Sequence, residues 1–452
     1  MLKDACLVAL LAPLVLCGPR SLAQDEEVAD ATVRDWFSGD LELGLDVART
    51  SEDGDIELDQ VLRLKMDPPK RERLHFQTTL WTIEDLDGPE ESTSTLRTIN
   101  DASDSSVQAR LLSLYMEVDD LGGDSTLRLG RQRIVEGVVY NRIDGGFYKW
   151  RNRRWEVYGF GGARASIYED AHGDYSVGAG ASVRLPTKTR LGVDYFYGED
   201  DRRTFEGDEV ASSLTAFSVR QQLATNHSLY ARATWFDTDL DEVRLSAQGL
   251  FSAQEIVYTL SYRNQLSPVA DRVTDITEFY RVLGELNEYQ DAQALLSIPV
   301  TKRFTLGLEG QVHEAENSSE TTGNRDYFRV GTSFDFYKVL KHYDLSVYLN
   351  YWDSEFGEGQ VTITGEVTRE WAKVKATLGL DYDRFQDRLI EFDETAQEAF
   401  TVESREDIYS AYARVRYTIN DQHALRFYTI FEEDDGPDSP YWRLRAEYVL
   451  SF

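Results

Sequence analysis

Cysteine is almost absent from this sequence, which contains only two, Cys6 and Cys17. Both lie in an N-terminal stretch typical of a secretory signal peptide, in which the apolar run Leu7–Leu16 is followed by a small-x-small cleavage motif. We therefore predict a signal peptide over residues 1–23 and a mature domain over residues 24–452. Such a domain has no disulfide, thiolate metal site or covalently attached haem, and we predict no cofactor.

Long apolar runs and positive charge are also scarce. Beyond the predicted signal peptide, no run approaches the roughly 20 apolar residues of a membrane-spanning helix. The 48 Lys and Arg residues stand against 80 Asp and Glu residues, for a net charge of −32, and so acidic a chain does not hold nucleic acid through its phosphates. Tyr (25) and Phe (21) are abundant, whereas Pro (10) and Met (3) are rare, which favours extensive β-sheet.

Recognisable catalytic motifs are missing as well. The 6 histidines are scattered without the spacing of metal ligands. The sequence contains neither a G-x-S-x-G nucleophile elbow nor a phosphate-binding loop, and carboxylate pairs such as Asp434-Asp435 stand in acidic, loop-like stretches. We predict neither enzymatic activity nor a dedicated metal site.

The sequence is rich in segments that alternate apolar and polar residues. Tyr175–Leu185, Val374–Tyr382 and Tyr409–Tyr417 are clear examples, and such a period of two indicates a strand with one apolar and one polar face. The segments are about ten residues long, which matches a tilted strand that crosses a bilayer. We predict an all-β fold, a single transmembrane antiparallel β-barrel of about 22 strands, within a range of about 18–22.

The predicted connections fall into two classes. Some are short, such as Ala224–Asn226 and Asn420–Gln422, whereas the segments that begin at Glu84, Gly198 and Asp383 are long and acidic. Because the two classes alternate along the chain, we predict long extracellular loops and short periplasmic turns.

The C-terminus, PYWRLRAEYVLSF, has an unbroken apolar stripe at every second position. Tyr448, Leu450 and Phe452 resemble the C-terminal assembly signal of outer-membrane β-barrels. The resemblance implies that the barrel-assembly machinery is a partner, that the stripe faces lipid, and that the protein is located in a bacterial outer membrane.

A second resemblance covers Leu127–Trp150. Porins of the alginate-export type carry a Gly-Arg-Gln motif at a strand end, followed by a strand that contains Asp. Gly130-Arg131-Gln132 and Asp144 match this pattern. The resemblance implies a Gram-negative, porin-like barrel that passes an anionic polysaccharide.

Strand parity places many basic side chains on the face opposite the apolar stripe. The predicted pore-lining residues are Arg128, Arg184, Arg232, Arg244, Arg263, Arg329, Arg414, Arg416, Arg426, Arg443 and Arg445. In one interpretation they form a basic ladder for anionic solutes. In the other they alternate with inward carboxylates in ion pairs that stiffen the wall.

The connection that begins at Asn264 differs from the other long ones because its apolar residues have helical spacing. The candidate residues are Val273, Ile276, Phe279, Tyr280 and Leu283. The segment could constrict the barrel, pack on its rim or bind a partner, and we favour the constriction because a wide barrel otherwise leaks.

Together these patterns favour an outer-membrane porin, surrounded by lipid, for passive passage of small or anionic solutes. The alternative is a barrel sheath around a periplasmic or extracellular protein partner, such as a multihaem cytochrome in an electron conduit. Since the chain itself carries no haem motif, haem would then come from the partner.

Overall fold

The computed structural model describes residues 36–51, 53–68, 73–87, 96, 106–165, 174–200, 210–267, 288–316, 318, 325–339, 342–393, 398–434 and 439–452. The predicted signal peptide and the predicted constriction residues Val273, Ile276, Phe279, Tyr280 and Leu283 lie outside these ranges. No helix in the described ranges is long and apolar enough to cross a membrane.

The described chain forms one sheet of 22 strands, as predicted. The strands are β1 (Phe37–Arg49), β2 (Gly54–Met66), β3 (Leu74–Asp85), β4 (Val107–Asp119), β5 (Asp124–Glu136), β6 (Val139–Arg151), β7 (Trp155–Arg164), β8 (Tyr175–Arg184), β9 (Thr189–Asp200), β10 (Val210–Ala224), β11 (His227–Phe236), β12 (Asp239–Phe251), β13 (Ile256–Gln265), β14 (Tyr289–Thr301), β15 (Phe304–Ala315), β16 (Tyr327–Val339), β17 (Tyr343–Ser354), β18 (Gly359–Glu370), β19 (Val374–Asp393), β20 (Glu398–Thr418), β21 (His423–Glu433) and β22 (Tyr441–Ser451).

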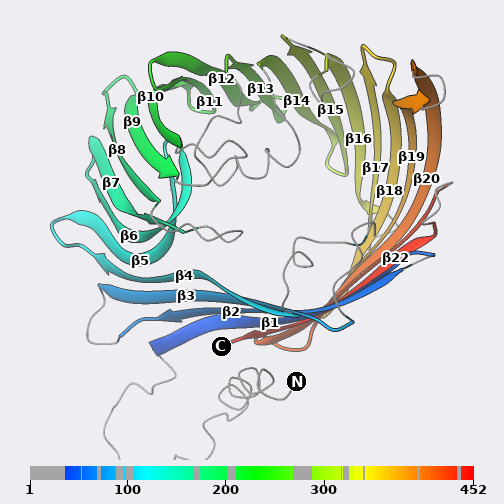
Figure 1. The fold of residues 1–452 in the computed structure, drawn as a ribbon, viewed down its shortest axis with the longest axis horizontal. Coiled ribbons are helices and arrows are strands. Elements are labelled where there is room, and N and C mark those ends of the chain that lie inside the picture. Colours follow the sequence, from blue (N-terminus) through cyan, green and yellow to red (C-terminus); the bar gives the residue numbers. More distant parts are fainter. Residues whose placement is uncertain are drawn as a thin grey trace, which may run out of the picture.

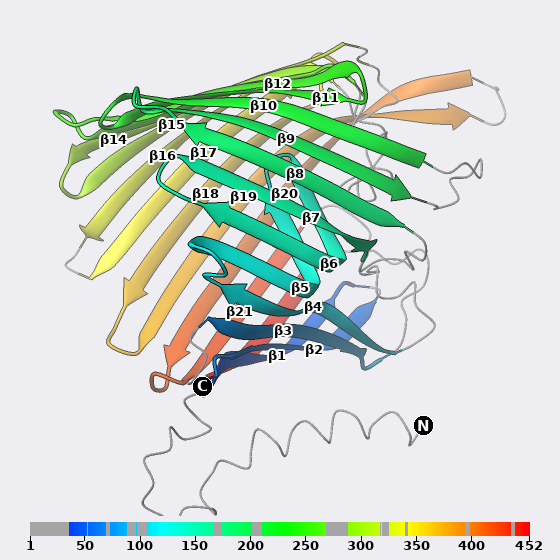
Figure 2. The ribbon, with the colours of Figure 1, turned by 90° about the vertical axis from the view of Figure 1, so that its left-hand side faces the viewer.

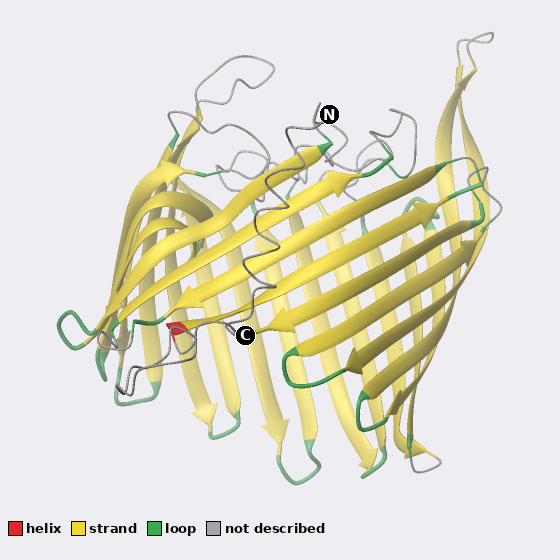
Figure 3. Cartoon of the chain, turned by 90° about the horizontal axis from the view of Figure 1, so that it is seen from below, coloured by secondary structure: helices red, strands yellow, loops and turns green. Residues whose placement is uncertain are grey.

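Each strand pairs antiparallel with its neighbours in the sequence, and β1 also pairs with β22, which closes the barrel. Figure 1 shows the resulting ring, and Figure 3 shows the strands tilted across it. At the seam, Leu41 lies opposite Leu450 and Asp46 lies opposite Arg445. The apolar stripe therefore continues from strand to strand on the outer face, and the charged stripe continues on the inner face.

The outer face carries many exposed apolar side chains, among them Leu45, Leu378 and Leu380. A soluble protein rarely exposes so extensive an apolar surface, whereas a lipid-facing barrel wall requires one. Because the barrel is closed, no sheet edge exposes unpaired backbone N–H and C=O groups to lipid, which cannot form hydrogen bonds with them. The wall is therefore built to stand in a bilayer.

The connections divide between the two ends of the barrel, although less strictly than the sequence pattern predicts. The start of β1 and the end of β22 lie at the same end, which we take as periplasmic, and the turns at this end are short. At the other end the connections from β1 to β2, β5 to β6, β11 to β12 and β17 to β18 are also short. Residues after Asp383, predicted as loop, continue β19 to Asp393 and pair with β20.

Candidate functional site: the lumen wall and an infolded hairpin

The end of the β5–β6 hairpin leaves the barrel wall. β5 pairs with β4 only as far as Arg131, and β6 pairs with β7 only from Ile143 onward. The two strands nevertheless stay paired with each other up to their tight turn. The carbonyl oxygen of Arg142 still accepts a hydrogen bond from the backbone amide of Ala165 at 2.9 Å. Residues 132–141 are therefore held in a ladder that pairs with neither β4 nor β7. Figures 1 and 2 show this cyan segment inside the ring, behind β7–β9.

Glycine makes the departure possible. Gly130 has φ +126°, which L side chains rarely adopt, and a Cβ there would overlap the carbonyl oxygen of Leu114. Gly145 lies directly opposite Gly130, and a Cβ at Gly145 would overlap the backbone of Gly161. Two backbones therefore approach closely where the hairpin bends out of the wall.

The motif that resembles alginate-export porins forms the base of this hairpin. Arg131 and Asp144 make a two-pronged ion pair, with Nε–Oδ1 and Nη2–Oδ2 distances of 2.7 and 2.6 Å. Gln132 is buried, and its amide donates to the backbone oxygens of Arg128 (3.4 Å) and Gly145 (3.3 Å). These residues brace the bend.

The tip of the hairpin rests on the inner face of β8, β9 and β11. The buried Asn141 amide donates to the Ser176 hydroxyl at 2.7 Å. Arg232 donates to the carbonyl oxygen of Gly137 at 3.4 Å. A Cβ at Gly137 would overlap the carboxyl group of Asp194, so glycine lets the turn lie directly against the wall.

An apolar cluster fills the space between the hairpin and the wall. Its buried residues are Ile134, Val139, Ile143, Phe147, Tyr158, Phe160, Phe196 and Leu214. By strand parity these side chains belong to the lumen face, where water would otherwise reach them. Full burial stabilises each large apolar side chain by about 1.5–3 kcal/mol, so the cluster holds the hairpin firmly.

The cluster depends on glycines in β8. Phe160 lies across Gly178, where a Cβ would overlap its ring, and Tyr158 lies across Gly180 in the same way. The Tyr158 hydroxyl then reaches Asp194 and donates to its carboxylate at 2.8 Å. Small residues in β8 thus let aromatic rings from β7 lie flat against the inner wall.

The opposite face of the hairpin tip points away from the wall, toward the open lumen. Arg133 and Arg142 stand opposite each other on this face. The guanidinium of Arg133 lies 3.9 Å from the centre of the Tyr140 ring, and Val135 is 62% exposed. The tip therefore narrows the lumen and places two arginines at the narrowing. The alternation of apolar and polar residues does not reveal this hairpin, although inward apolar residues such as Phe196 indicate that something covers them.

The predicted arginine row of β11, β12 and β13 is present. Arg244 lies directly opposite Arg232 on one side and Arg263 on the other. All three pair with one carboxylate, Glu242, at nitrogen–oxygen distances of 3.0, 3.0 and 2.7 Å. Glu242 is only 3% exposed. Its inward parity was evident in the sequence, but its position among the three arginines depends on the register of three strands.

Most predicted arginines near the seam are engaged in ion pairs. Arg443 contacts Asp46 at 2.7 Å, and Arg445 contacts Asp59 at 2.8 Å. These pairs cross the junction between the last and first strands, so they support the structural interpretation there. The remaining pairs are Arg414 with Glu366, Arg426 with Glu447 (3.4 Å), Arg128 with Glu117, and Arg329 with Glu309 (3.5 Å).

Two predicted arginines lack such a partner in the described part of the chain. Arg416 stands between Lys375 and Arg426 in the register, with no carboxylate oxygen of the described residues within 4.0 Å. Arg184 is in the same situation on β8. Arg190 lies opposite Arg184 on β9, and Arg220 lies opposite Arg190 on β10. Neither Arg190 nor Arg220 was among the predicted pore-lining residues.

The closed sheet, with its apolar outer face and charged inner face, is the architecture of a membrane-spanning barrel. The chain is a transmembrane β-barrel of the bacterial outer-membrane type. No protein-family model matches it, and no curated protein matches it.

Solved structures do resemble the chain in fold. A P pilus tip assembly intermediate of E. coli, PapC-PapD-PapK-PapG, aligns with a TM-score of 0.55 at 10% identity over 92% of this chain and 60% of that one. A BenF-like porin from Pseudomonas fluorescens Pf-5 aligns at 0.44, with 11% identity over 92% of this chain and 98% of that one. OccAB4 of Acinetobacter baumannii aligns at 0.43, with the same identity and coverages. At such identities a likeness shows the fold alone.

Proposed function

We propose that the protein is a passive outer-membrane channel for small solutes that favours anions. The observation that carries the proposal is a closed wall whose inner face is charged and whose lumen is narrowed by a hairpin that presents arginines. A closed barrel of 22 strands encloses a lumen wide enough to leak without such a narrowing. The hairpin takes the role that we predicted for the connection after Asn264, whose own role stays a prediction.

The preference for anions follows from where basic side chains gather along the lumen. Arg133 and Arg142 stand at the narrowing, and three arginines share Glu242 on the adjacent wall. In a narrow passage with low-dielectric walls, such groups attract anions more strongly than they would in bulk water. The net charge of −32 acts over longer distances and is screened within about 8 Å at physiological salt. Passage of a polysaccharide and a protein partner stay predictions.

Planar-bilayer recording tests the proposal. In one variant residues 133–142 are replaced by an Asn-Gly turn that joins Gln132 to Ile143, which lie opposite each other in the ladder. We expect a larger single-channel conductance, because the narrowing is removed.

A second variant keeps the hairpin and its apolar contacts. Arg133→Glu together with Arg142→Glu should shift the reversal potential in a KCl gradient toward that of cations, most at low salt. Arg303→Glu, in the exposed turn between β14 and β15, is the matched control and should leave it unchanged. A barrel that is silent in every form would refute the channel and favour the sheath.

A further inference from the structure

A second row of directly opposed arginines lies near the periplasmic end of the lumen wall. Arg184 on β8 faces Arg190 on β9, and Arg190 faces Arg220 on β10. Like charges placed directly opposite each other on neighbouring strands destabilise a sheet. The row therefore raises the question of what balances its charge.

Another row of opposed arginines in the same barrel shows how such repulsion can be balanced. In the row Arg232–Arg244–Arg263, a carboxylate two residues from Arg244 on the same strand, Glu242, pairs with all three guanidinium groups. Three opposed arginines and one shared anion thus form a stable unit in this wall.

The periplasmic row has no such shared carboxylate. Arg190 pairs with Glu156 at 2.8 Å. Among the described residues, no carboxylate oxygen lies within 4.0 Å of Arg184 or Arg220, and both side chains are exposed. Arg220 lies 5.6 Å from the centre of the Tyr230 ring, which leaves its hydrogen-bond donors available. Gln222, two residues from Arg220 on the same strand, is uncharged.

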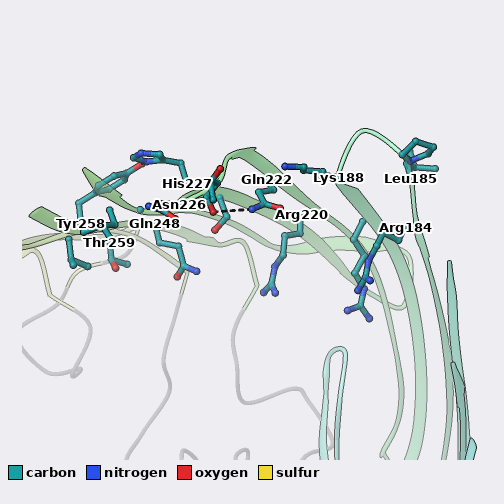
Figure 4. Close-up of a pocket in the computed structure, with 17 residues that line it drawn as sticks. Arg184, Leu185, Lys188, Arg220, Gln222, Asn226, His227, Gln248, Tyr258 and Thr259 are labelled. Carbon is teal, nitrogen blue, oxygen red and sulfur yellow. Dashed lines mark hydrogen bonds between the residues drawn. The ribbon is translucent and has the colours of Figure 1, made fainter. Parts of the chain in front are cut away.

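A cavity of about 960 Å³ stands in front of this row, and its lining contains no carboxylate. Figure 4 shows Arg184 and Arg220 pointing to the same side of the wall. Lys188, in the turn between β8 and β9, adds a further cation to the lining. The site is thus positively charged and open to solutes in the lumen.

Part of the lining consists of uncharged polar side chains. Gln222, Ser228, Gln248 and Thr259 follow one another in the register of β10 to β13, and all four line the cavity. Figure 4 shows Gln248 and Thr259 on the same side as the arginines. Amide and hydroxyl groups both donate and accept hydrogen bonds, so this part of the lining suits a neutral, hydroxylated portion of a ligand.

We propose that this site binds a small polyhydroxylated organic anion, with its anionic group between Arg184 and Arg220 and its hydroxyl groups toward Gln222 and Ser228. The ligand's oxyanion supplies the charge that Glu242 supplies in the other row. This inference rests on the proposed channel function, since it names the class of solute that the channel would hold at its periplasmic end.

Equilibrium binding to the purified full barrel in detergent tests the site without any measurement of current. Gluconate is the probe, glucose has the hydroxyl groups without the charge, and propionate has the charge without the hydroxyl groups. We expect saturable binding of gluconate, at least about tenfold tighter than that of either comparator, because charged hydrogen bonds and hydroxyl contacts act together.

Two variants test the geometry. Arg184→Gln with Arg220→Gln should weaken gluconate binding by about tenfold or more. Gln222→Glu places a carboxylate two residues from Arg220, beside the intact arginines, and should compete with the ligand, with a similar loss. Arg303→Gln is the control and should bind as the native barrel does.

The outcomes separate the two proposals. Gluconate that binds no tighter than glucose or propionate, or that binds the Arg184 and Arg220 variant normally, overturns the site even if the barrel conducts. Binding by a barrel that never conducts supports the site and overturns the channel. Each variant is first shown to be folded by heat-modifiable migration in electrophoresis, so that lost binding cannot reflect a lost barrel.

Discussion

Glu242 provides a direct test of how the lumen wall tolerates opposed arginines. The substitution Glu242→Gln keeps the size of the side chain and one acceptor oxygen but removes the charge that Arg232, Arg244 and Arg263 share at 3.0, 3.0 and 2.7 Å. Because Glu242 is 3% exposed, water cannot replace it. Removing one partner of a buried ion pair typically costs about 3–5 kcal/mol, and we expect a loss near the lower figure, since the arginines are 16–40% exposed.

The matched control is an ion pair on the same barrel that water reaches freely. Asp124 and Arg151 are 60% exposed in their side chains and 2.6 Å apart. Exposed pairs contribute about 0–1 kcal/mol, so Asp124→Asn should have a small effect. Tryptophan fluorescence, from the 8 tryptophans of the chain, would follow unfolding by guanidinium in lipid vesicles.

The two variants should also differ in their response to salt. Salt screens exposed charges and hardly affects buried ones, so the loss caused by Glu242→Gln should persist in 1 M KCl. In the same variant the local charge of the row rises, and anion selectivity should increase at low salt. Equal destabilisation by Glu242→Gln and Asp124→Asn would refute the argument from burial.

Three further predictions concern assembly, the hairpin and topology. Phe452→Ser should reduce the amount of heat-modifiable barrel in the outer membrane, because the last strand loses its lipid-facing end; a normal amount would contradict the assembly-signal resemblance. Gly178→Ala should destabilise the barrel by about 1–3 kcal/mol through overpacking against the aromatic cluster. Gly310→Ala is the control and should hardly change the stability, because nothing lies within 4 Å of the added Cβ. Equal melting temperatures of the two variants would refute the packing argument. A cysteine at Asp434 should react with an impermeant thiol reagent on whole cells and one at Thr225 should not; the reverse pattern would invert the assigned orientation.

Strand number and strand faces could be predicted from the sequence because a period of two is a local property. The inward direction of Arg232, Arg244 and Arg263 follows from parity alone, and the register then brings them together. The sharing of Glu242 could not be predicted in this way, since it depends on the relative positions of three strands. Parity gives the face on which a side chain lies, and the pairing of strands decides what it contacts.

The infolded hairpin escaped prediction for a related reason. Alternation continues through β5 and β6 whether or not the strands remain in the wall, so the pattern itself does not mark the departure at Arg131. The departure is indicated instead by apolar residues on the face that is otherwise charged. Ile134 and Ile143 are buried there, and a water-filled lumen would not bury them. The connection after Asn264 drew attention instead because its helical spacing was conspicuous.

The separate ladder of the hairpin end has a consequence for the energetics of motion. Because residues 132–141 form no ladder with β4 or β7, the tip can swing off the inner wall without breaking any hydrogen bond between wall strands. The cost of that movement is the exposure of the apolar cluster and the loss of a few polar contacts, and it is independent of the free energy that holds the barrel together. Opening and unfolding are therefore separate equilibria in this protein. A substitution such as Ile134→Ala should raise the frequency of transient high-conductance states while leaving the wall's resistance to denaturant almost unchanged.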